Sequence, residues 1–92
     1  MDKVKRHKKV LKALHRLYKC KNADYSDSFC KVRSDYPNAI LIRLTDKIER
    51  LKSLYNCIAP RVKDESVRDT LLDLANYAIL EVVELDAASE ES

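Results

Sequence analysis

The chain has 92 residues and a formal net charge of +3, and it contains no glycine and only two prolines. The lack of glycine excludes glycine-rich phosphate loops and dinucleotide-binding fingerprints, and it argues against an all-β fold, whose tight turns depend on this residue. The same composition favours helices joined by short turns. A domain of this length buries only a small core, so we also expect association into at least a dimer.

The first predicted helix covers residues 4–18 and is basic on one side. An apolar stripe follows its other side, through Val10, Leu11, Leu14, Leu17 and Tyr18. Residues 1–21 carry nine Lys and Arg against one acid, whereas residues 64–92 carry one Arg against nine acids. The basic side could meet nucleic acid, but no aromatic residues interleave with it to stack on bases. We therefore favour pairing with the acidic end of the same fold or of a partner subunit.

Residues 21–28 (KNADYSDS) predict a turn, because Asn22, Asp24 and the neighbouring polar residues can bond local backbone amides. A short helix is expected from about Ser28 to Arg33. The next helix has Pro37 in its first turn, where the fixed φ of proline is suitable, and it ends near Asn56. Its apolar positions recur at helical spacing: Ile40, Leu41, Leu44, Ile48, Leu51 and Leu54.

The segment CIAPRVK (residues 57–63) predicts a connector broken at Pro60, and Asp64 or Ser66 is expected to cap the last helix. The predicted buried face of that helix consists of Val67, Leu71, Leu74, Ala78, Val82 and Leu85. Residues 86–92 are small and acidic, so we expect a disordered tail after a single domain spanning residues 1–85. The predicted fold is all-α, a small bundle of three long helices plus one short helix, with the last two long helices antiparallel.

Acidic residues lie on both of these antiparallel helices. Asp46 and Glu49 share one face of the first, and Asp69, Asp73 and Asn76 share one face of the second. A connector centred near residue 60 brings the two sets level with each other. Crowded carboxylates repel unless a cation compensates, and Mg²⁺ takes carboxylate oxygens while it keeps water for substrate phosphates. The candidate Mg²⁺ ligands are therefore Asp46, Glu49, Asp69 and Asp73.

The same residues also fit an ordinary solvated surface. A polar stripe on the last helix passes through Thr70, Asp73, Tyr77, Glu81 and Glu84. Arg43, Lys47 and Arg50 lie near enough to the upstream acids for helical ion pairs, and Lys52 falls level with Asp69. Spacing alone does not choose between a metal site and such a surface.

The cysteines indicate a reducing compartment. Their number is odd, their spacings are wide, and no C-x-x-C motif occurs among Cys20, Cys30 and Cys57. No secretory signal is present, and the uncharged stretches are too short to span a bilayer. We therefore expect a cytoplasmic protein with no membrane partner. His7 and His15 lack a supporting acid and are expected on the surface.

Three segments carry a resemblance to a known family. KNADYSDSF, AILIRLTDKIERLKSL and DESVRDTLLDLANYAIL resemble the nucleotide-modification-associated type 1 domains, which are frequent in phages and prophages. That family is regarded as a branch of the MazG-like all-α nucleoside triphosphate pyrophosphatases. The resemblance runs from about Lys21 to Leu85. It implies a helical bundle, assembled as a dimer or tetramer, that splits a nucleoside triphosphate into monophosphate and pyrophosphate in a bacterial or phage-infected cell.

The resemblance also implies roles for individual residues. Asp46-x-x-Glu49 fits the first acidic motif of MazG-like enzymes with one conservative change. Two pairs of acids could form the second motif, Asp69-x-x-x-Asp73 or Glu65-x-x-x-Asp69. In each pair the acids are four residues apart instead of three. Glu65 is a candidate general base or a group that orients a metal ligand. Lys47 and Arg50 could offset the charge of phosphates, and Asn76 completes the nucleotide-facing set.

The segment KNADY (residues 21–25) is the other shared motif. Lys21 could neutralise a phosphate, Asn22 and Asp24 could bind a sugar or base edge, and Tyr25 could stack on a base. A helix end followed by a turn, with Tyr25 in the core, explains the same residues without a ligand.

Two functions follow as expectations. The first is Mg²⁺-dependent nucleotide binding with activity like that of a nucleoside triphosphate pyrophosphohydrolase. The second is a non-catalytic helical phage accessory protein that binds a protein partner or nucleic acid through its basic first helix.

Overall fold

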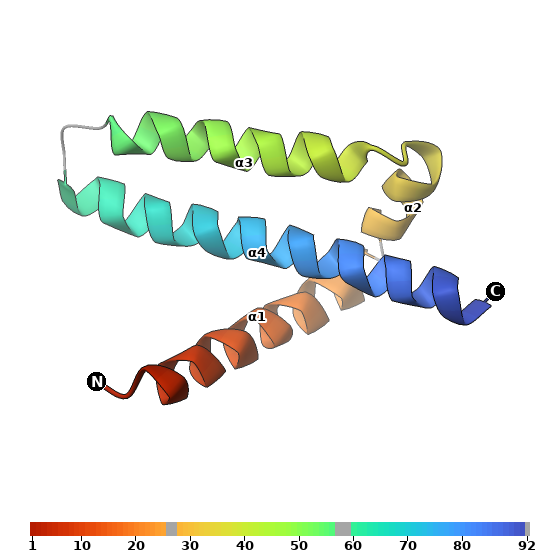
Figure 1. Ribbon diagram of the computed structural model, residues 1–92, viewed down its shortest axis with the longest axis horizontal. Helices are drawn as coiled ribbons and strands as arrows, with labels where there is room; N and C mark the ends of the chain where they lie inside the picture. The colour runs from red at the N-terminus through yellow and green to blue at the C-terminus, as the bar shows by residue number, and fades with distance from the viewer. Residues whose placement is uncertain (26–27, 57–59, 92) are drawn as a thin grey trace.

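The protein is built from helices throughout the part of the chain that the structure describes. The computed structural model describes residues 1–25, 28–56 and 60–91. Within these ranges the chain forms α1 (Lys3–Tyr25), α2 (Ser28–Asp35), α3 (Ala39–Tyr55) and α4 (Pro60–Glu91), with no strand (Figure 1). The predicted all-α architecture of three long helices plus one short helix is confirmed. None of these helices combines the length and the apolar character needed to cross a membrane.

The first helix is longer than the sequence predicted. α1 begins where Asp2 Oδ1 accepts hydrogen bonds from the backbone N–H groups of Val4 (3.0 Å) and Lys5 (3.2 Å), as expected of an N-cap aspartate. It continues through Tyr25, so the turn predicted at residues 21–25 is wrong. These residues include no glycine or proline, so helical hydrogen bonding is not interrupted. Residues 26–27 lie outside the described residues.

The helix after α2 begins two residues later than predicted. Pro37 lies in the turn, Asn38 occupies the N-cap position, and α3 starts at Ala39, whose N–H donates to the Tyr36 carbonyl at 2.9 Å. The end predicted near Asn56 is confirmed. There the Asn56 N–H donates to the Ser53 carbonyl (3.2 Å), and its side-chain amide donates to the Lys52 carbonyl (3.0 Å).

The last helix extends beyond its predicted bounds at both ends. α4 begins at Pro60, so Asp64 and Ser66 lie inside it instead of capping it. Proline suits the first position of a helix because no hydrogen-bond donor is needed there. At the other end, residues 86–91 are helical where a disordered tail was expected, because alanine and glutamate are good helix formers. Of the connector expected at residues 57–63, residues 60–63 belong to α4 instead, and residues 57–59 lie outside the described residues.

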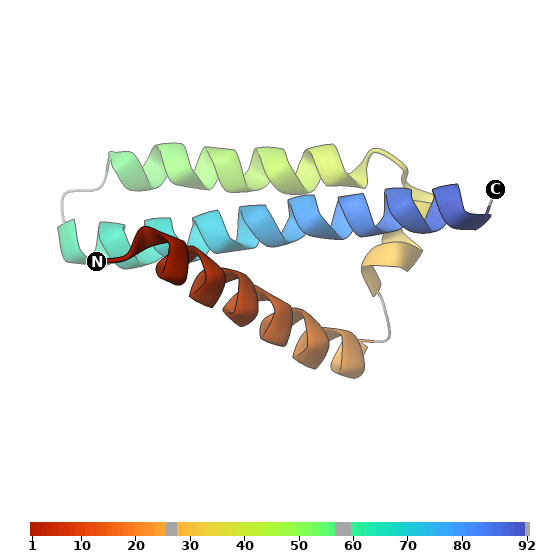
Figure 2. The same cartoon turned by 60° about the horizontal axis from the view of Figure 1, so that its bottom comes forward.

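α3 and α4 form the main packing unit, an antiparallel helical hairpin (Figures 1 and 2). Three contacts define its register. The Arg43 guanidinium lies 5.7 Å from the centre of the Tyr77 ring, Lys47 Nζ lies 3.5 Å from Asp73 Oδ2, and Arg50 Nε donates to Thr70 Oγ1 at 3.2 Å. The numbers in each pair sum to 120, so the predicted antiparallel pairing is confirmed with a shift of one residue.

A two-point ion pair fastens the short helix α2 to α4. Arg33 Nε and Nη2 donate to Glu81 Oε1 and Oε2, each at 3.0 Å. The hydrogen bond to Glu81 is the main reason why the pKa of the Arg33 guanidinium is raised above its ordinary value. The Phe29 ring packs beside Tyr77, with 6.3 Å between the ring centres. α2 therefore reaches the same side of α4 that α3 contacts.

α1 lies apart from this unit over most of its length and crosses α4 obliquely (Figures 1 and 2). Among its described side chains only Leu14 is fully buried. Across the described side chains of the whole molecule, the buried set is Leu14, Ala39 and Thr70. The single chain therefore encloses a very small core.

We predict that Thr70→Val lowers the free energy of unfolding by about 1 kcal/mol, because valine keeps the shape of threonine but removes its hydroxyl. That hydroxyl is buried, donates to the Ser66 carbonyl at 2.7 Å and accepts from Arg50. Urea unfolding followed by circular dichroism measures the loss. In an Arg50→Met background the same change should cost about 0.5 kcal/mol less. Equal losses in both backgrounds would show that the Arg50 contact carries no energy.

Candidate functional site

Basic residues of α3, not acidic ones, face α4. Arg43, Lys47 and Arg50 recur at spacings of four and three, which places them along one side of the helix. Each meets a residue of α4 at the same level, as the contacts with Tyr77, Asp73 and Thr70 show. One edge of the interface between the two helices is therefore a row of cations set against a polar stripe, beside the half-buried apolar positions of α3.

Lys47 and Asp73 form the ion pair at the centre of this row. Their charged atoms lie 3.5 Å apart, and the two side chains are 24% and 45% exposed. Because water reaches both groups, the attraction is strongly screened. Lys47 nevertheless supplies the positive charge near Asp73 that the sequence analysis assigned to a metal ion.

Asp46 and Glu49 lie on the outer face of α3. Both are exposed, and Glu49 Oε1 accepts a hydrogen bond from Lys52 Nζ at 3.0 Å. With Leu41, Ile42 and Thr45 they line a shallow surface hollow of about 400 Å³. The rotation of α3 follows from its half-buried positions Ile40, Leu44, Leu51 and Leu54, which turn toward α4 and leave the two acids on the other side.

The four predicted metal ligands do not form a common cluster within one chain. Among the described residues, no three His, Cys, Asp or Glu side chains are close enough to hold a metal ion. Asp69 is exposed on α4, Asp73 contacts Lys47, and the α3 acids point outward. The expectation that the acids of α3 face those of α4 is wrong for the single chain. That expectation was based on the positions of the residues along the helix axes, and these positions do not determine how each helix is rotated about its axis.

The remaining predicted site residues are spread over the fold. Glu65 is exposed near the start of α4, Asn76 is half-buried in the middle of α4, and Lys21 is exposed near the end of α1. Asn22, Asp24 and Tyr25 belong to α1 by their backbone, but their side chains lie outside the described residues, so their proposed roles stay predictions. Lys47 and Arg50 are brought together on the side of α3 that meets α4.

The polar stripe on α4 has a packing role that was not predicted from the sequence. Thr70, Asp73, Tyr77 and Glu81 fitted a solvated face, yet these residues make the contacts with α3 and α2. Thr70 is only 2% exposed. The available signal was a threonine and a tyrosine seven residues apart with one acid, Asp73, between them. Three cations at matching spacing lie opposite on α3.

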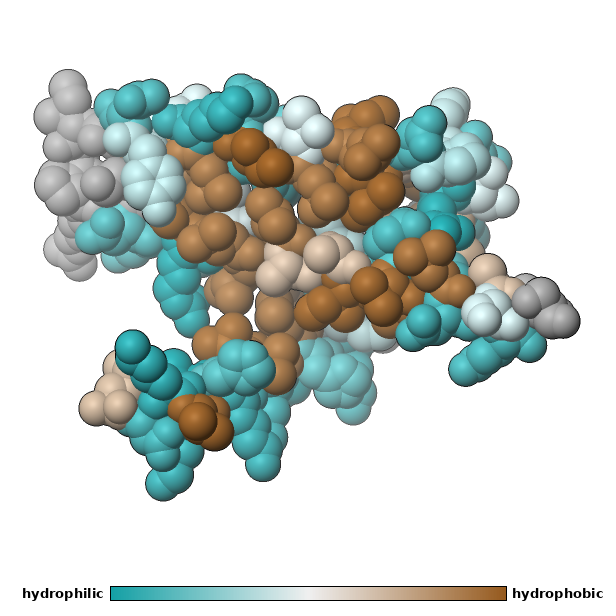
Figure 3. All heavy atoms as spheres, in the orientation of Figure 1, coloured by the Kyte–Doolittle hydropathy of each residue, from teal (hydrophilic) through white to brown (hydrophobic). Residues whose placement is uncertain are grey.

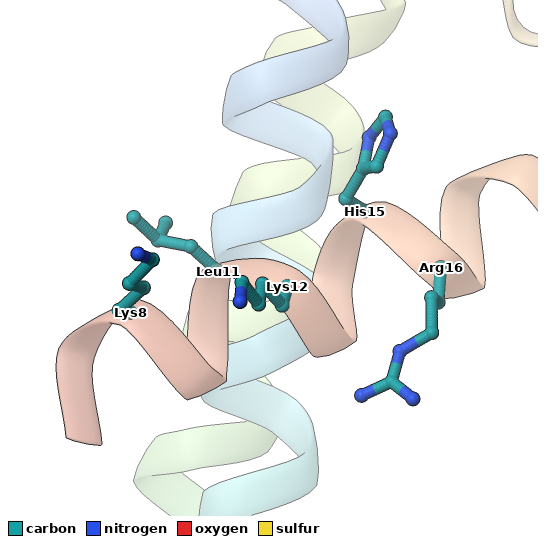
Figure 4. A pocket seen from close by; sticks show the side chains of 5 residues that line it. All are labelled: Lys8, Leu11, Lys12, His15 and Arg16. Atoms are coloured by element: carbon teal, nitrogen blue, oxygen red, sulfur yellow. The ribbon is translucent and has the colours of Figure 1, made fainter. Parts of the chain in front are cut away.

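The basic helix α1 presents a second hollow. It has a volume of about 580 Å³ and is lined by Lys8, Leu11, Lys12, His15 and Arg16, all from this one helix (Figure 4). The ion pairs Arg33–Glu81, Lys47–Asp73 and Lys52–Glu49 lie within or between α2, α3 and α4, and they include no described side chain of α1. The favoured pairing of the basic start with the acidic end is therefore not formed inside the described part of one chain.

The comparisons with known proteins locate the shared region. A family model described as nucleotide modification associated domain 1 matches residues 21–85. The match covers α2, α3 and most of α4, together with the end of α1. No curated protein and no solved structure matches the chain.

We predict that Lys47 and Asp73 couple by less than about 1 kcal/mol, because both are open to solvent. A double-mutant cycle with Lys47→Met and Asp73→Asn, read from urea unfolding, measures this coupling. The coupling should shrink further at roughly 1 M salt, where screening is strong. A coupling of several kcal/mol that salt leaves unchanged would contradict the solvated geometry described above.

Proposed function

Because the chain belongs to the nucleotide modification associated domain 1 family, we propose that it binds a nucleotide and acts in nucleotide metabolism or modification. The observation that carries the proposal is the extent of the family match. Residues 21–85 include every position predicted to contact nucleotide or metal, from Lys21 to Asn76. The matched region also contains all of α3 and the part of α4 that ends at Leu85.

The exposed edge of α3 is the proposed docking place for the phosphates. Arg43, Asp46 and Arg50 recur at spacings of three and four along it, and all three are exposed residues. A guanidinium can donate two parallel hydrogen bonds to phosphate oxygens. Arg43 and Arg50 are already oriented by their contacts with Tyr77 and Thr70. Less side-chain entropy is then lost when a phosphate chain binds.

The outer face of α3 is the proposed start of a metal site. Asp46 and Glu49 offer two carboxylates there, whereas no three acids, histidines or cysteines gather among the described residues of a single chain. Mg²⁺ prefers six oxygen ligands and commonly takes one or two carboxylates plus water and substrate phosphates. We propose that Mg²⁺ accompanies the nucleotide and that a homo-oligomer, a dimer or tetramer, completes the site. Bound Mg²⁺ would neutralise phosphate charge.

The reaction class proposed for test is hydrolysis of a nucleoside triphosphate to monophosphate and pyrophosphate. The support is the resemblance of Asp46-x-x-Glu49 to the first acidic motif of the MazG-like pyrophosphatases. A screen of nucleoside triphosphates, with detection of released pyrophosphate in the presence and absence of Mg²⁺, tests this activity. Binding without turnover would retain the nucleotide-binding proposal and remove the hydrolase assignment.

We predict that Mg²⁺ and a nucleoside triphosphate together raise the melting temperature, while neither does so alone. A ligand at about a hundred times its dissociation constant stabilises the folded state by roughly 2.7 kcal/mol. Asp46→Asn should abolish this shift and leave the helical content unchanged. Asp86→Asn is the matched control, since Asp86 is an exposed acid outside the family match. If both variants keep the full shift, Asp46 is not part of the site.

The second candidate function is binding of nucleic acid through α1. The observation that favours it is the cationic hollow on α1 and the lack of ion pairs to α1 within the described residues. This function predicts binding of DNA or RNA that weakens steeply with salt and does not respond to Mg²⁺ plus nucleotide. Lys12→Ala should weaken such binding, whereas Lys31→Ala, an exposed lysine on α2, should leave it unchanged. Equal binding by the two variants would contradict a role for α1.

A further inference from the structure

α4 carries an apolar seam that the described parts of the chain leave half open. We define the α4 seam as the residues Leu71, Ala75, Ala78, Val82 and Leu85, which recur at spacings of four and three. Leu71, Val82 and Leu85 are 48%, 54% and 53% exposed. Alternating spacings of four and three are the pattern by which one helix packs against another along its length. The seam therefore has the form of an unused helix-packing surface.

The seam lies apart from the polar contacts that α4 makes with its neighbours. The hydrogen bonds, ion pairs and ring contacts from α3 and α2 reach α4 at the polar stripe of Thr70, Asp73, Tyr77 and Glu81. At about 100° per residue, this stripe lies on a different side of α4 from the seam. The space-filling view in Figure 3 shows apolar side chains spread over α3 and α4 on an open face, with the mostly hydrophilic α1 below. α4 thus has one side occupied within the chain and another side available.

The area exposed by a single chain is large enough to supply an interface. The accessible surface is 7528 Å², whereas a compact monomer of 10.7 kDa is expected to expose roughly 5,500 Å². The radius of gyration is 15.3 Å, against about 12 Å for a compact domain of this length. The excess of roughly 2,000 Å² per chain is of the order that stable homodimers bury. Part of this surface is therefore available to a partner.

We propose that a second copy of this chain docks on the α4 seam, so that two α4 helices pack antiparallel about a two-fold axis near Ala78. Alanines at the centre of the seam allow close approach of the two helix backbones. Leu71 and Leu85 are each seven residues from Ala78, so Leu71 of one copy lies level with Leu85 of the other. One patch that pairs with itself is what two-fold symmetry requires.

Charge selects the antiparallel direction. Residues 76–91 carry five acids and no base, whereas residues 60–75 carry three bases and four acids. Parallel packing would set two acidic halves side by side, and their repulsion would oppose association. Antiparallel packing sets each acidic half against the nearly neutral half of the other copy. This inference rests on the homo-oligomer of the proposed function and names the face on which it forms. A chain that does not dimerise through the seam could still bind nucleotide, so the two failures can be distinguished.

The first test measures self-association without nucleotide, by sedimentation velocity over a range of concentrations. The wild-type chain should form a dimer. Val82→Glu, within the seam, should raise the dissociation constant at least about tenfold, because a carboxylate would be buried without a partner. Val83→Glu is the matched control: Val83 is 44% exposed but lies off the seam, and its dissociation constant should change less than about twofold.

Three results would overturn the proposal. These are a wild-type chain that is monomeric at every concentration, equal weakening by the two variants, and association that appears only when nucleic acid is present. Circular dichroism of each variant shows whether helix content is kept.

A second measurement does not depend on weakening the dimer. Under mild oxidation Ala78→Cys should form a cross-linked dimer in higher yield than the wild-type chain, whose own cysteines provide the background. Leu85→Cys alone should not exceed this background. In the antiparallel arrangement the two copies of residue 85 lie roughly 21 Å apart along the helix axis, while a disulfide needs α-carbons within about 7 Å. Efficient cross-linking through Leu85→Cys would indicate parallel packing and overturn the proposed arrangement.

Discussion

The antiparallel contact between α3 and α4 is the constraint on which the rest of the structure depends. Arg43, Lys47 and Arg50 meet a polar stripe of α4 and mark the register of the hairpin, while the half-buried apolar positions of α3 determine its rotation. Rotation decides which side chains become available for chemistry. With the apolar positions turned toward α4, Asp46 and Glu49 are left on the outer face beside Leu41 and Ile42. The same contact occupies one side of α4 and leaves its apolar seam for another partner.

Helix number, helix type and the antiparallel register could be predicted from the sequence, because apolar spacing and connector length determine them. The bounds of α1 and α4 could not. Polar residues at 21–25 and 86–91 fit a turn or tail as well as a helix, and only continued backbone hydrogen bonding distinguishes these states. The candidate site was predicted in part. The predicted positions of the residues along the helix axes were close to correct. The direction in which Asp46 and Glu49 point was not, because α3 carries cations and acids on adjacent sides.

The family assignment and the geometry bear on function in different ways. The family match covers the hairpin and points to nucleotide chemistry. The geometry adds two groups of side chains that the proposed site would use: guanidinium groups oriented by Tyr77 and Thr70, and a pair of carboxylates on the neighbouring outer face. A chain with three buried side chains among those described has little core of its own. Assembly would then serve stability and site formation together, because each additional contact between copies buries apolar surface and brings donor groups closer.

The Lys47–Asp73 pair has a consequence for any divalent ion that approaches α4. Such an ion meets a carboxylate whose charge is already balanced by an ammonium group held 3.5 Å away. Coordination would displace Lys47, and the released side chain could swing toward the phosphates that arrive with the ion. Lys47 would thus act as a resident counter-ion that competes with free ions in solution. Because solvent screens the pair, this competition costs an arriving ion less than about 1 kcal/mol. A polyanion that attracts the Lys47 side chain would lower that cost further, so the ion and the polyanion would favour each other's binding.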